Sequence, residues 1–229
     1  MVFPAAALTV LGYLASGFLV IAACEAGYDG RWLISREWTL ERIGFYSGIS
    51  YTIGSLVAVL ADLLIERRFV GRYLAFPEEM LLTGEADGRR RWKRALFRVY
   101  FQPVPEEFRA RIITRALHDQ VPASGRALFL HASATAGDDR ALLNRLRVSL
   151  EFSRVCRTMC LALLVVAAIL ASGMIGHGFS TRWGQAEWRK FGYFAWALSE
   201  STFMLYRYLK FLRQHTLQVL AGYSELPVS

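Results

Sequence analysis

A single acid in an apolar, aromatic stretch is the first candidate for a functional side chain. The stretch AWALSESTFMLY occupies positions 195–206 and places Glu200 at its centre. An ionised carboxylate inside a lipid bilayer is costly unless it is paired, hydrated or protonated, so intramembrane acids face a bundle interior or water. We therefore expect Glu200 either to line a pore or sense protons or ions, or to act as a polar clamp between helices. On a helix, Tyr193, Trp196, Met204 and Arg207 would share its face, and Ser199 and Ser201 would flank it.

A second acid, Asp62, lies near the end of another apolar segment. Arg157 and Arg207 are expected at a similar depth, so a structural ion pair is the favoured interpretation and a pathway-lining carboxylate is the alternative. The same segment carries a GxxxG motif made by Gly44 and Gly48. Small residues at this spacing predict close helix packing, either within the chain or between copies of it.

The strongest charge feature is the basic run GRRRWKRALFR at positions 88–98. On a helix its arginines would lie opposite Trp92, Leu96 and Val99, which is the pattern of an amphipathic helix on anionic lipid. Nucleic acid or a nucleotide messenger is the sharper alternative, but a neighbouring membrane segment makes lipid the simpler explanation. The residues expected to bind lipid or a partner are Arg91, Lys93, Arg94 and Arg98.

Catalytic motifs are absent from the sequence. It contains no HExxH, GxSxG, CxxC or phosphate-binding glycine loop. His118 beside Asp119, and His131 further on, lack a recognisable metal-ligand spacing, so we assign them to helix ends and solvated faces. No metal, cofactor or enzymatic activity is expected, and a lipid enzyme using Glu200 is the least favoured class. The three cysteines, Cys24, Cys156 and Cys160, are expected to be reduced, buried small hydrophobes.

Composition places the chain among small basic membrane proteins. Its 229 residues are 54% hydrophobic and carry a net charge of +8. Residues 2–24 contain no charged side chain and are long enough to cross a hydrocarbon core of roughly 30 Å. Segments 43–64 and 159–176 are similarly apolar, whereas segment 191–206 is shorter and contains Glu200, so hydropathy alone does not decide it.

Basic residues set the expected orientation, because short loops rich in Lys and Arg stay in the cytosol. Arginines follow the second apolar segment and precede the third, which assigns residues 65–157 to the cytosol. The basic residues after Tyr206 belong inside as well, and this requires segment 191–206 to be a fourth span. The tryptophans at positions 32, 38, 183 and 188 fit the headgroup level outside. Lipoprotein processing at the box ending in Cys24 is not expected, because no basic residue precedes the first span.

The expected cytosolic segment consists of helices separated by proline and glycine breakers. PEEFRARIITRALHDQ predicts a helix that starts near Pro105 and has an apolar stripe. Asp138 and Asp139 are expected to cap a helix of about 35 residues that continues into the third span, since no breaker occurs before Gly173. Strand patterns are missing, so no sheet is predicted. The apolar stripe of the helix that starts near Pro105 comprises Ile112, Ile113, Ala116 and Leu117.

The sequence thus predicts an all-α integral membrane protein with four transmembrane helices and a helical cytosolic domain inserted between helices 2 and 3. The expected parts are a first transmembrane pair over 1–64, a basic helical cytosolic domain over 65–157, a second pair over 158–213 and a cytosolic tail over 214–229. Both termini are expected in the cytosol of a bacterium, with the spans in its inner membrane.

The leading functional hypothesis is a homo-oligomeric channel-like or membrane-perturbing protein that is gated through its cytosolic domain. Four spans scarcely enclose a pathway, whereas repeated copies around an axis can. The alternative is a non-conducting scaffold or sensor that recruits a soluble cytosolic partner, as in a stress or antiviral defence system. Expected partners are anionic membrane lipids, further copies of the chain and such a soluble protein, while nucleic acid is disfavoured.

Overall fold

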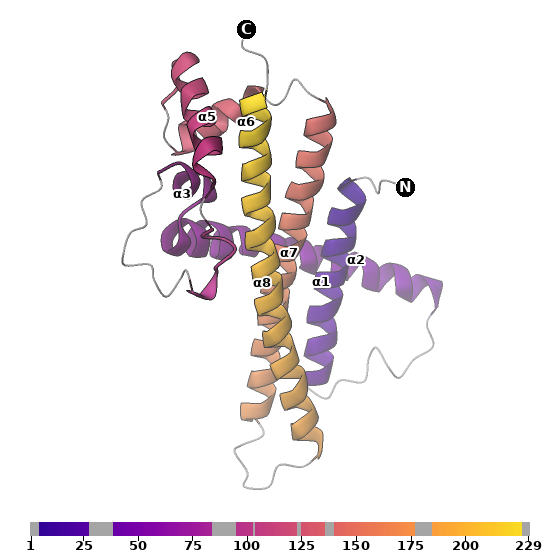
Figure 1. The fold of residues 1–229 in the computed structure, drawn as a ribbon. Coiled ribbons are helices and arrows are strands. Elements are labelled where there is room, and N and C mark those ends of the chain that lie inside the picture. Colours follow the sequence, from indigo (N-terminus) through magenta and orange to yellow (C-terminus); the bar gives the residue numbers. More distant parts are fainter. Residues whose placement is uncertain are drawn as a thin grey trace. The chain divides into compact units, whose positions relative to one another are not determined.

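The described part of the chain is helical. The computed structural model describes residues 5–27, 39–83, 95–102, 104–122, 125–135, 140–176 and 185–225, and among them no strand occurs, as the sequence predicts (Figure 1). The chain divides into two compact units. Unit 1 comprises Met1–Ile65 and Arg154–Arg207, and unit 2 comprises Glu66–Ser153 and Tyr208–Ser229.

Three described helices are long and apolar enough to cross a membrane. These segments are Ala6–Gly27, Leu40–Leu81 and Leu146–Met174. The first lies in α1 (Ala5–Gly27), the second begins with α2 (Leu40–Ala61), and the third lies in α7 (Arg140–Gly176). A further long helix, α8 (Gln185–Glu225), contains the stretch with Glu200. Over the described residues, the chain is therefore all-α and has three helices suited to a membrane.

Helices α1 and α2 cross at two glycines. A methyl group added at Gly17 would lie 1.8 Å from the backbone oxygen of Ser50, and one added at Gly54 would lie 1.9 Å from that of Tyr13. The two backbones are thus in direct contact, which only residues without a side chain allow. The GxxxG glycines that the sequence marks for packing lie elsewhere on α2. A methyl group at Gly44 or Gly48 meets nothing within 4 Å in the described chain.

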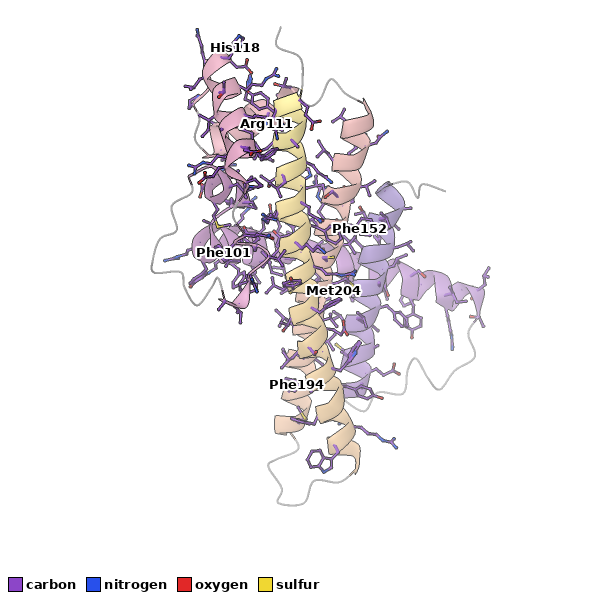
Figure 2. The ribbon with its side chains drawn as sticks, viewed as in Figure 1. Phe101, Arg111, His118, Phe152, Phe194 and Met204 are labelled. Atoms are coloured by element: carbon purple, nitrogen blue, oxygen red, sulfur yellow. The ribbon has the colours of Figure 1, made fainter. Side chains whose placement is uncertain are left out.

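Small residues also hold α7 against its neighbours in unit 1. A methyl group at Gly173 would come within 2.7 Å of the backbone oxygen of Gly27 on α1. The core of unit 1 consists of apolar residues from α1, α7 and α8, with Phe194 and Met204 of α8 packed against it (Figure 2). Cys156 and Cys160 are buried free thiols, whereas Cys24 is exposed rather than buried. The core residues are Ala23, Leu163, Val166, Ala167, Leu170 and Ala197.

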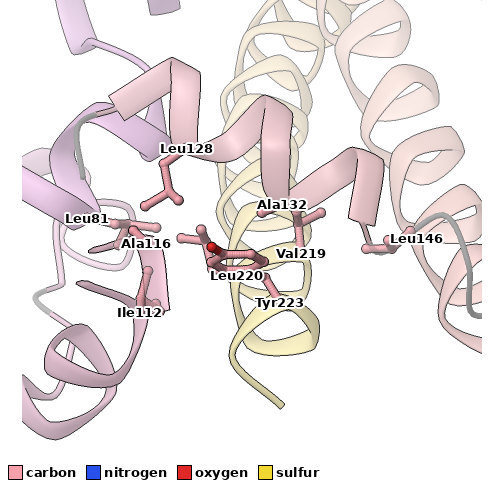
Figure 3. Packing of buried hydrophobic residues seen from close by; sticks show 9 residues of the cluster. All are labelled: Leu81, Ile112, Ala116, Leu128, Ala132, Leu146, Val219, Leu220 and Tyr223. Carbon is pink, nitrogen blue, oxygen red and sulfur yellow. The ribbon is translucent and has the colours of Figure 1, made fainter. Parts of the chain in front are cut away.

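Unit 2 contains the shorter helices together with the N-terminal part of α7 and the C-terminal part of α8. These helices are α3 (Pro77–Thr83), α5 (Glu106–His118) and α6 (Gly125–Thr135). One apolar cluster joins all of these elements (Figure 3). The helix predicted after Pro105 is confirmed as α5, although Leu117 of its expected apolar stripe is 68% exposed. The cluster comprises Leu81, Ile112, Ala116, Leu128, Ala132, Leu146, Val219, Leu220 and Tyr223.

The chain remains helical after α2 ends at Ala61. It continues as a π-helix, η1 (Asp62–Leu74), a wide form of helix that is rare at this length. The next residue, Ala75, has a φ of 66°, which lies in the left-handed region. The carbonyl of Ala75 accepts a hydrogen bond from the buried Tyr100 hydroxyl at 2.8 Å, and the rings of Phe69 and Phe97 meet edge to face with centroids 6.4 Å apart. Segment 95–102 therefore packs on η1.

Helix α7 is a single uninterrupted element. It runs for 37 residues from Arg140 to Gly176, which confirms the long helix that the sequence predicts. Its continuity follows from local chemistry, because no proline interrupts the run and the first glycine, Gly173, comes near its end. Both α7 and α8 belong partly to unit 1 and partly to unit 2.

Alanine at the crossing glycines should destabilise the protein. Gly17→Ala or Gly54→Ala places a methyl group against backbone atoms, and such overpacking costs about 1–3 kcal/mol. The matched control is Gly192→Ala on α8, where nothing lies within 4 Å of the new methyl group. In a thermal melt of the detergent-purified protein, the first two substitutions should lower Tm, whereas the control should leave it unchanged or raise it. Equal Tm values for all three variants would contradict the crossing.

Candidate functional site

Asp62 makes an ion pair with Arg157 inside unit 1. The Arg157 Nη1 donates to Asp62 Oδ1 at 3.0 Å, and the two side chains are 10% and 36% exposed, respectively. Asp62 is the first residue of η1, so the pair joins the end of α2 to α7. A nearly buried guanidinium needs such a partner, because an uncompensated charge in apolar surroundings is strongly unfavourable. This geometry favours a helix-bridging role for Asp62 over a pathway-lining one.

A polar contact also joins α7 and α8, and it is made by the serine next to Glu200. Ser201 is buried, and its hydroxyl donates to the backbone oxygen of Cys160 at 3.0 Å. The Cys160 sulfur lies 3.4 Å from the same hydroxyl. Polar contacts of this kind hold apolar helices together, and this is the clamping role that the sequence analysis considered for Glu200. In the structure, Ser201 provides one.

Glu200 itself lies at the edge of the uncovered side of α8. Trp196 and Phe203, four residues before Glu200 and three residues after it, belong to the uncovered side and are 51% and 49% exposed. On its other side, Glu200 adjoins the buried Ala197, three residues before it, and the buried Ser201. Glu200 is half-buried, and its carboxylate has neither a hydrogen bond nor an ion pair with the described residues. We call the uncovered side, made by Tyr193, Trp196, Ser199, Glu200, Phe203 and Arg207, the Glu200 face; the Arg207 guanidinium lies 5.1 Å from the ring centroid of Phe203.

The GxxxG motif of α2 opens onto a shallow groove. The groove measures about 420 Å³ and is mainly apolar. Gly44 and Gly48 form part of its wall, and no described residue comes within 4 Å of a methyl group placed at either glycine. The α2 surface that the sequence marks for close packing is therefore unpartnered within the described chain. The lining residues are Gly44, Phe45, Gly48, Ile49, Thr52 and Ile53.

The expected basic face is only partly covered by the structure. Arg91, Lys93 and Arg94 lie outside the described residues, whereas Arg98 is exposed in a turn that follows a short helical segment. The neighbouring side chains differ from the expected helical face, because Leu96 is 64% exposed while Phe97 is buried. The contact of Phe97 with Phe69 brings the neighbouring Arg98 close to η1. This proximity was not predicted from the sequence.

A cluster of polar and ionisable side chains in unit 2 was likewise missed as a group. The Tyr223 hydroxyl of α8 donates to Asp119 Oδ2 at 2.7 Å. His118 Nδ1 lies 3.2 Å from Asp119 Oδ1, and His131 Nε2 of α6 lies 3.8 Å from Oδ2. Arg115 Nε approaches the same Oδ2 at 3.5 Å. The i, i+4 spacing of Arg115 and Asp119 is a signal in the sequence, but nothing local points to Tyr223.

This cluster shifts two pKa values in opposite directions. Hydrogen bonds from Tyr223 and His118, together with the nearby Arg115, hold the pKa of Asp119 below its usual value. Burial and the adjacent carboxylate raise the pKa of Tyr223 to about 12. The arrangement therefore stabilises a neutral phenol beside an ionised carboxylate. Within the described residues, no group of three or more His, Cys, Asp or Glu side chains could hold a metal ion.

The Tyr223 shift predicts how the stability of unit 2 depends on alkaline pH. Because the folded pKa lies above the unfolded value of about 10, the phenol stabilises the fold below pH 10, and this contribution is lost as pH rises through about 12. Tyr223→Phe should lower the urea midpoint at pH 8 and flatten the loss of stability between pH 10 and 12. The matched control is Tyr73→Phe, at an exposed tyrosine of η1. Identical alkaline profiles for wild type and Tyr223→Phe would contradict the hydrogen bond.

Comparison with known proteins adds no functional information. No protein-family model, no curated protein and no solved structure matches this chain.

Proposed function

We propose that the chain is an inner-membrane protein of a bacterium that crosses the bilayer four times, self-associates and forms a channel-like assembly gated through unit 2. The single observation that supports this most is that Glu200 lies at the edge of the uncovered face of α8, where its carboxylate has no hydrogen bond or ion pair with the described residues. If α8 crosses lipid, a carboxylate on that face is unfavourable unless water or another copy of the chain covers it. In an assembly with the Glu200 face turned inward, the carboxylate is covered by water in the pathway and by neighbouring copies of the chain.

The proposed fourth span is the part of α8 within unit 1. Between Lys190 and Arg207 the only charged residue is Glu200, and these 16 residues of helix span about 24 Å. Large apolar side chains are exposed on this part of α8, including Phe191 and Trp196. Exposure of such side chains suits lipid better than water. The segment is less apolar than the three helices named above because serine, tyrosine and tryptophan replace aliphatic residues, and the aromatic residues favour the headgroup level.

Cysteine accessibility tests this topology in intact cells. In a Cys24→Ser background, which removes the exposed native thiol, Trp188→Cys should react with a membrane-impermeant maleimide, because it lies at the proposed outer end of α8. Leu117→Cys, on an exposed position of α5, should react only after the cells are permeabilised. A tag after Ser229 should also be protected. A C-terminal tag that is accessible from outside would remove the fourth span and any intramembrane role for Glu200.

Self-association has its own structural support. The groove at Gly44 and Gly48 lies on a helix suited to a membrane, and no described residue comes within 4 Å of a methyl group placed at either glycine. Between transmembrane helices, small residues at this spacing permit close approach of two backbones. The intramolecular crossing uses Gly17 and Gly54 instead, so a second helix can dock at the groove without displacing α1. We propose that this second helix belongs to another copy of the chain.

Liposome flux measurements test the channel directly. Glu200→Gln removes the charge that should attract cations in a pathway, so it should change ion leak or ion selectivity several-fold while leaving assembly mass unchanged. The control is Thr202→Val, an exposed position of α8 away from the Glu200 face. Gly48→Leu should lower the assembly mass in detergent, because it fills the groove. A strict monomer without conductance would end this proposal.

The scaffold alternative keeps the same topology without a pathway. Its support is that unit 2 has its own apolar core, which is what a domain that recruits a soluble cytosolic protein requires. In that case Glu200→Gln leaves ion flux unchanged, while charge reversal in the basic segment around Arg98 abolishes recruitment. Anionic lipids remain expected partners in both versions, through the basic residues of the 88–98 run.

A further inference from the structure

We propose that η1 and the segment 95–102 together form one binding surface for the phosphate groups of anionic lipid headgroups. The inference rests on the proposed topology, in which α2 ends at the cytosolic side of the membrane. We call this the headgroup surface and define it by five exposed residues: Arg68, Arg72, Tyr73, Leu96 and Arg98.

One ring contact and one hydrogen bond bring the two segments together. Phe69 of η1 meets Phe97 edge to face, and it also lies 6.4 Å from the ring of Tyr73. Tyr100 bonds the backbone of Ala75 at the end of η1. Arg68 precedes Phe69 and Arg98 follows Phe97, so both arginines flank the same contact. Segments separated by about 25 residues thus contribute charge to one surface.

The arginines of this surface are available to a ligand. Arg68, Arg72 and Arg98 are exposed, and within the described residues none of them makes an ion pair or hydrogen bond. Arg68 and Arg72 are four residues apart, close to one turn of a π-helix, so they lie on a similar side of η1. The guanidinium group binds phosphate oxygens through paired hydrogen bonds, which suits a phosphodiester headgroup.

The acids of the following helix do not neutralise this charge. They lie on α3 and face α6 instead. The Cγ of Glu79 is among the nearest atoms to a methyl group placed at Gly125, at 3.5 Å, and Glu78 interacts with Arg126. The acids of α3 therefore do not pair with the arginines of the headgroup surface.

Exposed apolar side chains distinguish lipid from a soluble phosphate as the ligand. Tyr73 is 53% and Leu96 is 64% exposed beside the arginines. Apolar and aromatic side chains next to basic ones are the composition of a membrane interface, where the ring or methyl groups enter the acyl boundary and the charges meet the headgroups. The surface is also continuous in sequence with the candidate span that begins at Leu40. The ligand is therefore a lipid of the adjacent leaflet.

The test uses the full chain in nanodiscs of phosphatidylcholine with or without phosphatidylglycerol, and counts retained phosphatidylglycerol per chain by native mass spectrometry. Arg68→Glu with Arg72→Glu should lower phosphatidylglycerol affinity about tenfold or more, because each basic group near anionic lipid contributes to binding. Arg98→Glu alone should lower it several-fold. The matched control is Arg111→Glu with Arg147→Glu, the same charge change at exposed positions of α5 and α7.

Three results would overturn the inference. Equal losses of phosphatidylglycerol binding in the control and test variants would indicate a general charge effect. If Arg98→Glu did not change lipid binding, segment 95–102 would not belong to the same binding surface as η1. Displacement of the lipid by inorganic phosphate at equal concentration would identify a soluble anion as the ligand. Because lipid retention requires neither self-association nor conductance, absence of a channel leaves this measurement intact.

Discussion

Polar and charged groups among apolar helices have to be paired or covered, and this requirement organises the interior of unit 1. Arg157 is almost buried on α7, and Asp62 at the end of α2 neutralises it at 3.0 Å. The hydrogen bond between Ser201 and Cys160 satisfies a second polar group between α7 and α8. Glu200 is a charged exception, because its carboxylate has no such partner among the described residues. An acid that the chain does not pair for itself requires water or another chain once it lies in lipid.

The glycines of unit 1 fall into two groups: some lie at helix contacts within the chain, and others lie on a surface that no described helix covers. Gly17, Gly54 and Gly173 each lie against the backbone of another helix, and an added methyl group would collide there. Gly44 and Gly48 lie on the same helix as Gly54 but face a groove. Apolar helices gain little from hydrophobic burial in lipid, so close van der Waals packing at small residues decides which helices associate. The same chemistry therefore serves both the fold of unit 1 and the proposed assembly.

Unit 2 is organised by contacts that are distant in sequence. Its core joins Leu81 to Tyr223, and the Tyr223 hydroxyl is bonded to Asp119 at the end of α5. This bond fastens the C-terminal part of α8 to the short helices, while segment 95–102 is fastened to η1 by Phe97 and Tyr100. In the first arrangement, Asp119 lies beside the ring of Tyr223, and in the second, Arg98 lies beside the ring contact of Phe69 and Phe97. In the second arrangement the charges remain exposed, which is why that surface is suited to a ligand.

Local sequence was sufficient to predict the helical class, the helix after Pro105, the long helix from Arg140 and the three most apolar segments. These features depend on periodicity, breakers and composition. Tertiary packing decided which of the two arginines expected near Asp62 pairs with it, namely Arg157. It also decided that Ser201 rather than Glu200 bonds α7, and that Asp119 contacts Tyr223. The π-helical continuation of α2 and its contact with Phe97 were also absent from the pattern. Such partners are far apart in sequence, and they are chosen by how each helix is rotated and where helices cross, which no local pattern specifies.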